Sequence, residues 1–214
     1  MDPMVPEPPD EELMLAYAGG DDGALERLYL RHRGPLFTYV LHHSGRRSLA
    51  EDVTQDVFLR IVRGRASYSR RGSFRAWIYT IARNLIVDAR RRNRTRADSE
   101  GSVQRNETAR EEGGPRSPVD EALTQDPAAD PDRRSESLEL GRRIRAALQR
   151  LPEEQREVFL LRERAGLDFR AIAEVTGVGL ATVKSRMRYA LAGLRERLQL
   201  DAEHLLEVRH DRMP

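Results

Sequence analysis

Apolar residues recur every three or four positions along much of this chain, and this spacing limits the fold more than any other feature. One such series comprises Leu25, Leu28, Tyr29, Leu36, Phe37, Val40 and Leu41. A spacing of this kind places apolar side chains on one face of an α-helix, whereas a half-buried strand alternates at every second residue. Aromatic residues make up 6% of the chain and charged residues 34%. The sequence therefore predicts an all-α protein with modest helical cores and no large buried sheet.

The first predicted domain covers residues 11–96, after a lead-in at residues 1–10 whose four prolines predict disorder. Ser48, followed three residues later by Glu51, predicts a capping box for a helix from Leu49 to about Gly64. Small, polar and basic residues interrupt the apolar pattern from 66 to 72. Ser73 is then predicted to cap a long helix that ends near Arg92.

A linker is predicted at residues 97–137, where Gly, Pro, Ser, Asp and Glu dominate and both periodicity and aromatic residues disappear. A structureless stretch of this length is uncommon inside one compact domain, so the domain boundary is predicted here. The second predicted domain covers residues 138–200, and residues 201–214 form a tail without an assigned role.

The second domain contains the pattern of a helix-turn-helix. Pro152, with acidic residues in the next two positions, predicts a helix start. Asp168 is predicted to cap a short helix through Val175, Gly177 makes the turn, and a last helix runs from about Leu180 to Leu198. This layout places one helix across a DNA backbone and the next in the major groove.

The last helix has an apolar face and a polar face. The face predicted to pack inward consists of Val183, Met187, Ala190 and Leu194. The residues predicted to face base edges are Thr182, Ser185, Arg188 and Tyr189. Lys184 and Arg186 lie on the flanks and are predicted to contact phosphates. The alternative is an amphipathic helix hairpin with a solvated basic face.

Positive charge is concentrated in the first domain. Residues 60–96 contain twelve Arg and one acid, Asp88, while the segments on either side are acidic. A basic block of this kind predicts a polyanion-binding face, and the alternative is a solvated arginine-rich surface. Basic residues interleaved with aromatic ones, beside the segment 67–72, also predict a groove for unpaired bases. For Trp77 a core position is favoured, whereas Tyr68, Phe74 and Tyr79 stay open between the two roles.

Several kinds of site are not expected. The chain has no cysteine, which excludes disulfides and thiolate metal sites. It has no apolar run of membrane-spanning length and no signal segment, so a cytoplasmic protein without membrane insertion is predicted. It has no phosphate-binding glycine loop, and the histidines do not pair with carboxylates at a metal-binding spacing. We therefore expect no catalysis, metal, cofactor or small-molecule substrate. Two alternative interpretations of the DNA-binding pattern stay open, a stand-alone regulator and a nuclease.

Two pairs of motifs resemble a known family. AEDVTQDVFLR at 50–60 and SFRAWIYTIARN at 73–84 resemble region two of bacterial sigma factors of the extracytoplasmic-function (ECF) group. LPEEQREVFLL at 151–161 and TVKSR at 182–186 resemble region four of the same group. The likeness covers about residues 11–96 and 138–198. It implies a factor that binds core RNA polymerase, directs it to specific promoters and assists promoter melting by trapping splayed bases.

The resemblance also implies roles for individual residues. Asp52, Gln55 and Asp56 would dock on the polymerase clamp helices, and Leu160 and Leu161 would meet the polymerase flap. Minus-ten recognition, melting and upstream DNA contact would fall to Ser67, Tyr68, Arg70, Arg71, Phe74, Arg75, Trp77, Tyr79, Arg83, Asn84, Arg90 and Arg91. The last helix would read the minus-thirty-five element, and the linker would occupy the polymerase cleft. A dedicated anti-sigma factor is expected as a further partner.

Overall fold

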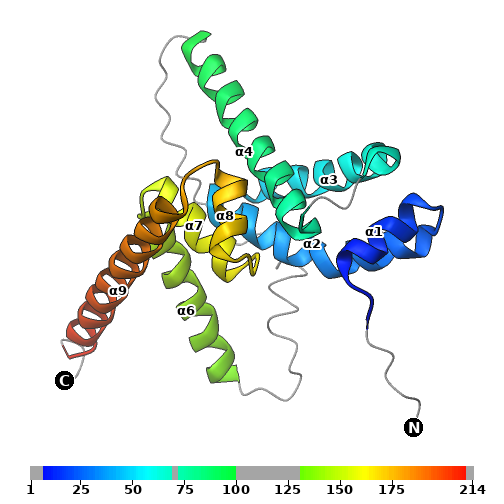
Figure 1. Cartoon of the computed structure of the whole chain (residues 1–214). Coiled ribbons are helices and arrows are strands. Elements are labelled where there is room, and N and C mark those ends of the chain that lie inside the picture. Colours follow the sequence, from blue (N-terminus) through cyan, green and yellow to red (C-terminus); the bar gives the residue numbers. More distant parts are fainter. Residues whose placement is uncertain (1–6, 69–71, 100–130, 211–214) are drawn as a thin grey trace.

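The protein is all-α in a computed structural model that describes residues 7–68, 72–99 and 131–210. The side chains of residues 67, 93, 94, 96–139 and 200–210 lie outside that description. The first domain contains α1 (Asp10–Ala18), α2 (Asp22–Ser44), α3 (Arg47–Gly64), the 3-10 helix η1 (Arg65–Ser67) and α4 (Phe74–Ser99). The second contains α6 (Pro131–Gln149), α7 (Glu153–Glu163), α8 (Phe169–Thr176) and α9 (Leu180–His210). The described ranges hold no strand, which confirms the predicted fold class (Figure 1).

Helix α2 is the centre of the first domain, with α1, α3 and α4 packed against it. Asp21 caps its start by accepting a hydrogen bond from the Ala24 amide at 3.2 Å. Gly45 ends it with a φ of 72°, a left-handed conformation that glycine adopts without steric cost. In the core, Tyr39 of α2 meets Tyr79 of α4 edge to face, with ring centroids 5.1 Å apart. Both rings are almost fully buried.

Helix α9 supports the second domain, with α6, α7 and α8 packed along it. The predicted cap of the short helix is confirmed, because Asp168 Oδ1 accepts a hydrogen bond from the Ala171 amide at 2.8 Å. The predicted turn is confirmed as well, since Gly177 has a φ of 71° and joins α8 to the loop before α9. The long α9 then projects past the rest of the domain (Figure 1).

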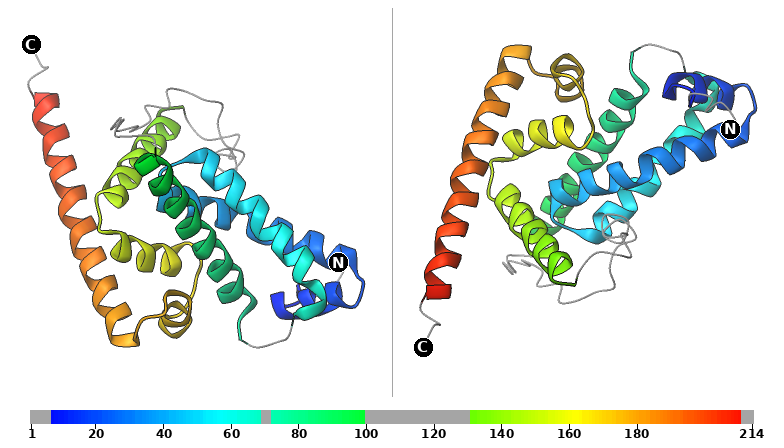
Figure 2. Two further views of the ribbon diagram at one scale, coloured as in Figure 1. Left: turned by 90° about the horizontal axis from the view of Figure 1, so that it is seen from above. Right: turned by 90° about the horizontal axis from the view of Figure 1, so that it is seen from below.

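The two domains pack against each other through α4 with α8, and through α2 with α6 and α7 (Figure 2). Gln149 at the end of α6 donates a hydrogen bond from Nε2 to the carbonyl oxygen of His42 at 2.7 Å. Within the described ranges, none of the helices combines the length and the apolar character that crossing a membrane requires.

Four predicted boundaries are corrected. Ser48 does not cap α3, because the helix already starts at Arg47, with Arg46 at the N-cap position and no side-chain cap hydrogen bond. Residues 7–10 are ordered rather than part of a disordered lead-in, and Asp10 is buried. Helical backbone replaces predicted linker at 97–99 and 131–137, while residues 100–130 lie outside the described residues. Helix α9 continues past Leu198 into the predicted tail.

Candidate nucleic-acid interface

Three arginines of α4 lie on one side of the helix. Arg75, Arg83 and Arg90 follow at intervals of eight and seven residues, which keeps them within about a quarter turn at 3.6 residues per turn. Arg75, Asn84 and Arg91 are exposed, whereas Arg83 and Arg90 are half-buried. The helix thus presents the basic side that the arginine-rich sequence predicted, but the second domain covers part of it.

Carboxylates occupy this basic side. Arg83 Nε donates to Glu157 Oε1 of α7 at 2.8 Å. Arg90 forms an ion pair with Glu153, which lies one turn earlier on α7. Because a carboxylate offers arginine the same kind of oxygen acceptors as a phosphate, these acids stand where a DNA backbone could stand. In the sequence, Glu153 is recognisable only as part of a helix-start signal, and no local signal points to Glu157.

Glu157 is enclosed by the interface. Burial raises the pKa of its carboxyl group, and the charges of Arg83, Arg186 and Arg90 act in the opposite direction. His43 Nε2 of α2 lies 3.9 Å from the same carboxylate. Burial, reinforced by nearby arginine charges, lowers the pKa of His43 to about 3, so His43 is neutral at pH 7 and this contact is not an ion pair.

Three aromatic rings form a cluster at the start of α4. The Tyr68 ring is centred 5.4 Å from Trp77 and 6.4 Å from Phe74, and Phe74 and Trp77 are 5.8 Å apart. Tyr68 and Trp77 are half-buried, so each keeps part of its ring accessible. Ser67 ends η1 with only its backbone described, and Arg70 and Arg71 lie outside the described residues.

Two predicted base-contacting aromatics are corrected to core residues. Phe74 and Tyr79 are each only 1% exposed, so their rings cannot stack on a nucleotide in this structure. Burial also raises the pKa of Tyr79. Trp77, for which a core position was favoured, is only partly buried. The adjacent Ile78 is fully covered, as is Ala82 one turn later.

The last helix has the predicted inward face. Val183, Met187, Ala190 and Leu194 are all buried. On the other side Thr182, Lys184, Arg188 and Tyr189 are exposed, while Ser185 and Arg186 are half-buried. The guanidinium carbon of Arg188 lies 5.1 Å from the centre of the Tyr189 ring, and its Nη2 lies 3.4 Å from the Tyr189 hydroxyl. This pair leaves a planar donor group on the outer surface of the helix.

The candidate polymerase contacts separate into exposed and buried groups. Asp52, Gln55 and Asp56 are exposed on α3. Gln55 lines a groove of about 970 Å³ between α2 and α3. Its exposed apolar lining residues are Tyr29, Leu30, Leu59 and Val62. Leu160 and Leu161 are 0% exposed, so their predicted surface role is corrected: both belong to the hydrophobic core.

The three histidines with described side chains, His32, His42 and His43, do not assemble a metal site. His42 and His43 are buried with no carboxylate cluster around them, and burial lowers the pKa of His42 to about 4. His32 Nε2 lies 2.9 Å from Asp10 Oδ2. Across the described ranges, no group of three or more His, Cys, Asp or Glu side chains is arranged to hold a metal ion.

Comparison with known proteins places both domains in one family. The chain matches the family models Sigma-70 region 2 over residues 28–96 and Sigma-70, region 4 over residues 141–194. It is 32% identical over 210 residues to the ECF RNA polymerase sigma factor SigE of Mycolicibacterium smegmatis, covering 94% of this chain and 73% of that protein. It is 29% identical over 185 residues to the ECF RNA polymerase sigma factor SigM of Mycobacterium tuberculosis, covering 86% and 82%.

Solved structures agree with this result. The sigma factor RpoE of Bartonella quintana, crystallised in complex with the anti-sigma factor NepR, has a TM-score of 0.60 and 25% sequence identity. The match covers 82% of this chain and 97% of that chain. A stand-alone regulator is excluded, because both sigma regions are present in the order that transcription initiation factors have. The chain belongs to the ECF group of RNA polymerase sigma factors.

Proposed function

We propose that this sigma factor binds core RNA polymerase, directs it to specific promoters and assists promoter melting, without chemistry of its own. The observation that carries the proposal is the basic side of α4, which begins beside the aromatic cluster of Tyr68, Phe74 and Trp77. A positive backbone-tracking side next to accessible rings suits a DNA strand that is being separated from its partner. Since bacterial transcription takes place in the cytoplasm, we propose that location for the protein.

Polymerase docking is assigned to α3. Asp52, Gln55 and Asp56 are exposed on this helix beside the apolar groove. Exposed acids at the edge of an apolar surface can attract a basic partner. The apolar side chains of that partner can then pack in the groove. We assign this surface to the clamp helices of the polymerase. The surface that meets the flap lies elsewhere on the second domain, because Leu160 and Leu161 are buried.

Promoter contacts are assigned to α4 and α9. Of the minus-ten candidates with described side chains, the accessible ones are Tyr68, Arg75, Trp77, Asn84 and Arg91. Arg83 and Arg90 become accessible as well when their ion pairs with the carboxylates of α7 break. On α9, Arg188, Tyr189 and Thr182 are assigned to minus-thirty-five bases and Lys184 to phosphates, as their exposure allows.

A regulatory partner is also proposed. The relative from Bartonella quintana was crystallised with an anti-sigma factor. We propose that this chain too is held inactive by such a protein, and the α2–α3 groove is the described apolar surface large enough to receive one of its helices.

The proposal is tested by run-off transcription with the purified full-length chain and bacterial core polymerase. The template is a promoter selected from a randomised DNA library by the wild-type holoenzyme. Specific transcripts are expected only when both components are present. The double variant Asp52→Ala, Gln55→Ala should lower transcription and core binding together, whereas Glu174→Ala, an exposed acid on α8, should leave both unchanged. If core polymerase gains no promoter specificity from the wild-type chain, the proposal fails.

A further inference from the structure

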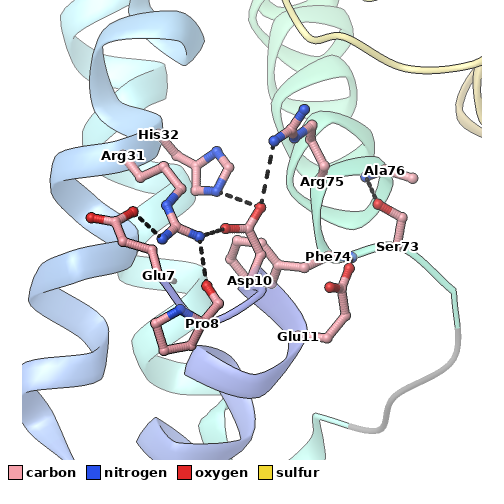
Figure 3. A network of polar contacts seen from close by, with 10 residues as sticks. All are labelled: Glu7, Pro8, Asp10, Glu11, Arg31, His32, Ser73, Phe74, Arg75 and Ala76. Carbon is pink, nitrogen blue, oxygen red and sulfur yellow. Dashed lines mark hydrogen bonds and ion pairs between the residues drawn. The ribbon is translucent and has the colours of Figure 1, made fainter. Parts of the chain in front are cut away.

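The first helix holds the start of α4 through a single carboxylate. Glu11 Oε1 accepts a hydrogen bond from the Phe74 amide at 2.8 Å (Figure 3). Phe74 is the first residue of α4, so its amide is one of the donors that a helix leaves without an internal partner. The local cap is weak, since Ser73 Oγ accepts from the Ala76 amide only at 3.5 Å. A residue 63 positions away thus completes the cap, with a charge that suits the positive end of the helix.

The neighbouring acid fixes the position of Glu11. Asp10 is 8% exposed, and its Oδ1 accepts a hydrogen bond from Arg31 Nη1 at 2.6 Å. Its Oδ2 lies 2.9 Å from His32 Nε2 and 3.9 Å from Arg75 Nη2. Figure 3 shows these contacts converging from α2 and α4 on the first turn of α1. Because a buried carboxylate paired with arginine is costly to move, α1 is held in one place.

Helix α1 also supports the other end of the segment that precedes α4. The guanidinium carbon of Arg65, in η1, lies 4.8 Å from the centre of the Tyr17 ring of α1. Tyr68, three residues later, packs against Phe74 and Trp77. Helix α1 therefore contacts both η1, through Tyr17, and the start of α4, through Glu11. Residues 10–18 lie outside the match to sigma-70 region 2, which begins at residue 28.

We propose that Glu11 is a positioning residue for promoter melting. With α1 anchored by Asp10, the Glu11 carboxylate fixes the first turn of α4 and with it the aromatic cluster of Tyr68, Phe74 and Trp77. An aromatic platform binds unpaired bases more tightly when its frame is ordered beforehand, because less freedom is lost on binding. This inference rests on the proposed function of the aromatic cluster in melting.

The test compares three variants in the full-length chain, assembled with core polymerase on the selected promoter. Glu11→Ala removes the acceptor, Glu11→Gln keeps an acceptor oxygen at the same place, and Glu12→Ala removes the adjacent exposed acid of α1 as a control. Each holoenzyme is assayed on duplex DNA and on the same promoter with a mismatched, already open minus-ten region. Permanganate reactivity of unpaired thymines reports melting directly.

Glu11→Ala should lower transcription and permanganate reactivity on the duplex by about tenfold, the loss expected for one hydrogen bond to a charged group. On the open template it should stay within about twofold of wild type, since melting is no longer required. Glu11→Gln should restore most duplex activity, and Glu12→Ala should match wild type throughout.

Two results would overturn the inference: wild-type activity of Glu11→Ala on the duplex, or an equal loss on both templates, which would mean a general structural role. Failure of the wild-type chain to give specific transcripts would instead remove the proposed function itself, and it is visible before any variant is made.

Discussion

Arg83 of α4 and Glu157 of α7 form an ion pair at 2.8 Å that joins the two domains of the chain. Arg90 and Glu153 repeat the arrangement two turns further along α4. The arginines that the family resemblance assigns to upstream DNA are therefore held by acids of the promoter-reading partner domain. We therefore propose that DNA and α7 compete for the same side of α4.

Removing the carboxylates of Glu153 and Glu157 should make the basic side of α4 available to DNA. We predict that Glu153→Gln with Glu157→Gln raises the affinity of the free chain for duplex DNA by about tenfold at low salt, because Arg83 and Arg90 become available to phosphates. Fluorescence anisotropy with labelled duplex DNA, without polymerase, measures the effect. Glu154→Gln, an exposed acid in the same turn, is the matched control. Unchanged affinity in the double variant would show that the domains do not compete with DNA.

Mild acid should weaken the same interface. Burial, with the charges of Arg90, Arg156 and Arg83, lowers the pKa of His43 to about 3, well under its usual 6.5. Between these values the unfolded chain binds more protons than the folded chain, so stability is complete above pH 6.5 and falls as pH decreases. The slope is at most about 1.4 kcal/mol per pH unit for one histidine.

Urea unfolding at pH 7.5, 6.5 and 5.5 measures this slope. His43→Gln should reduce it by about half, because His42, whose pKa burial lowers to about 4, keeps its share. Glu157 changes stability with pH in the opposite direction, because burial raises its pKa. The variant is therefore compared with wild type at each pH. Equal slopes in both proteins would rule out His43 as a source of the acid sensitivity.

Local signals in the sequence predicted local structure well. The Asp168 cap and the Gly177 turn depend on hydrogen bonds and φ values within a few residues, and both are present as predicted. The inward face of α9 follows from helical periodicity alone, and its four residues are buried. These features need no knowledge of what the rest of the chain does.

Features that depend on distant segments could not be predicted in the same way. Glu11 caps a helix 63 residues away, and Glu157 pairs with an arginine 74 residues away, so no spacing rule connects them. Tyr79 and Leu161 were assigned to surfaces by the family resemblance, but both are buried, and the Tyr79 ring packs on Tyr39 of its own domain. Amphipathic patterning shows one buried face and does not show a second partner.

The turn of the helix-turn-helix should depend on Gly177. Its φ of 71° disfavours any side chain, although a Cβ would meet no atom within 4 Å. We predict that Gly177→Ala lowers the free energy of unfolding of the second domain by about 1 kcal/mol through backbone strain alone. Gly141→Ala, inside α6 and also with free space, should raise it by about 0.5–1 kcal/mol. Thermal unfolding of both variants tests the opposite signs; a stabilising Gly177→Ala would contradict the assigned turn.

Removing the side chain of Arg188 and removing that of Lys184 should affect DNA binding in different ways. Both are exposed, but Arg188 lies opposite the buried face, beside Tyr189, where it can reach a base edge. We predict that Arg188→Ala costs about 1–3 kcal/mol on the selected promoter and little on a promoter changed at the contacted base pair. Lys184→Ala should weaken binding to all sequences by a similar factor and reduce the salt dependence by about one phosphate contact. Holoenzyme binding to single-substitution minus-thirty-five promoters at two salt concentrations separates these outcomes. A uniform loss for Arg188→Ala would assign it to the DNA backbone and leave base recognition to Thr182 and Tyr189.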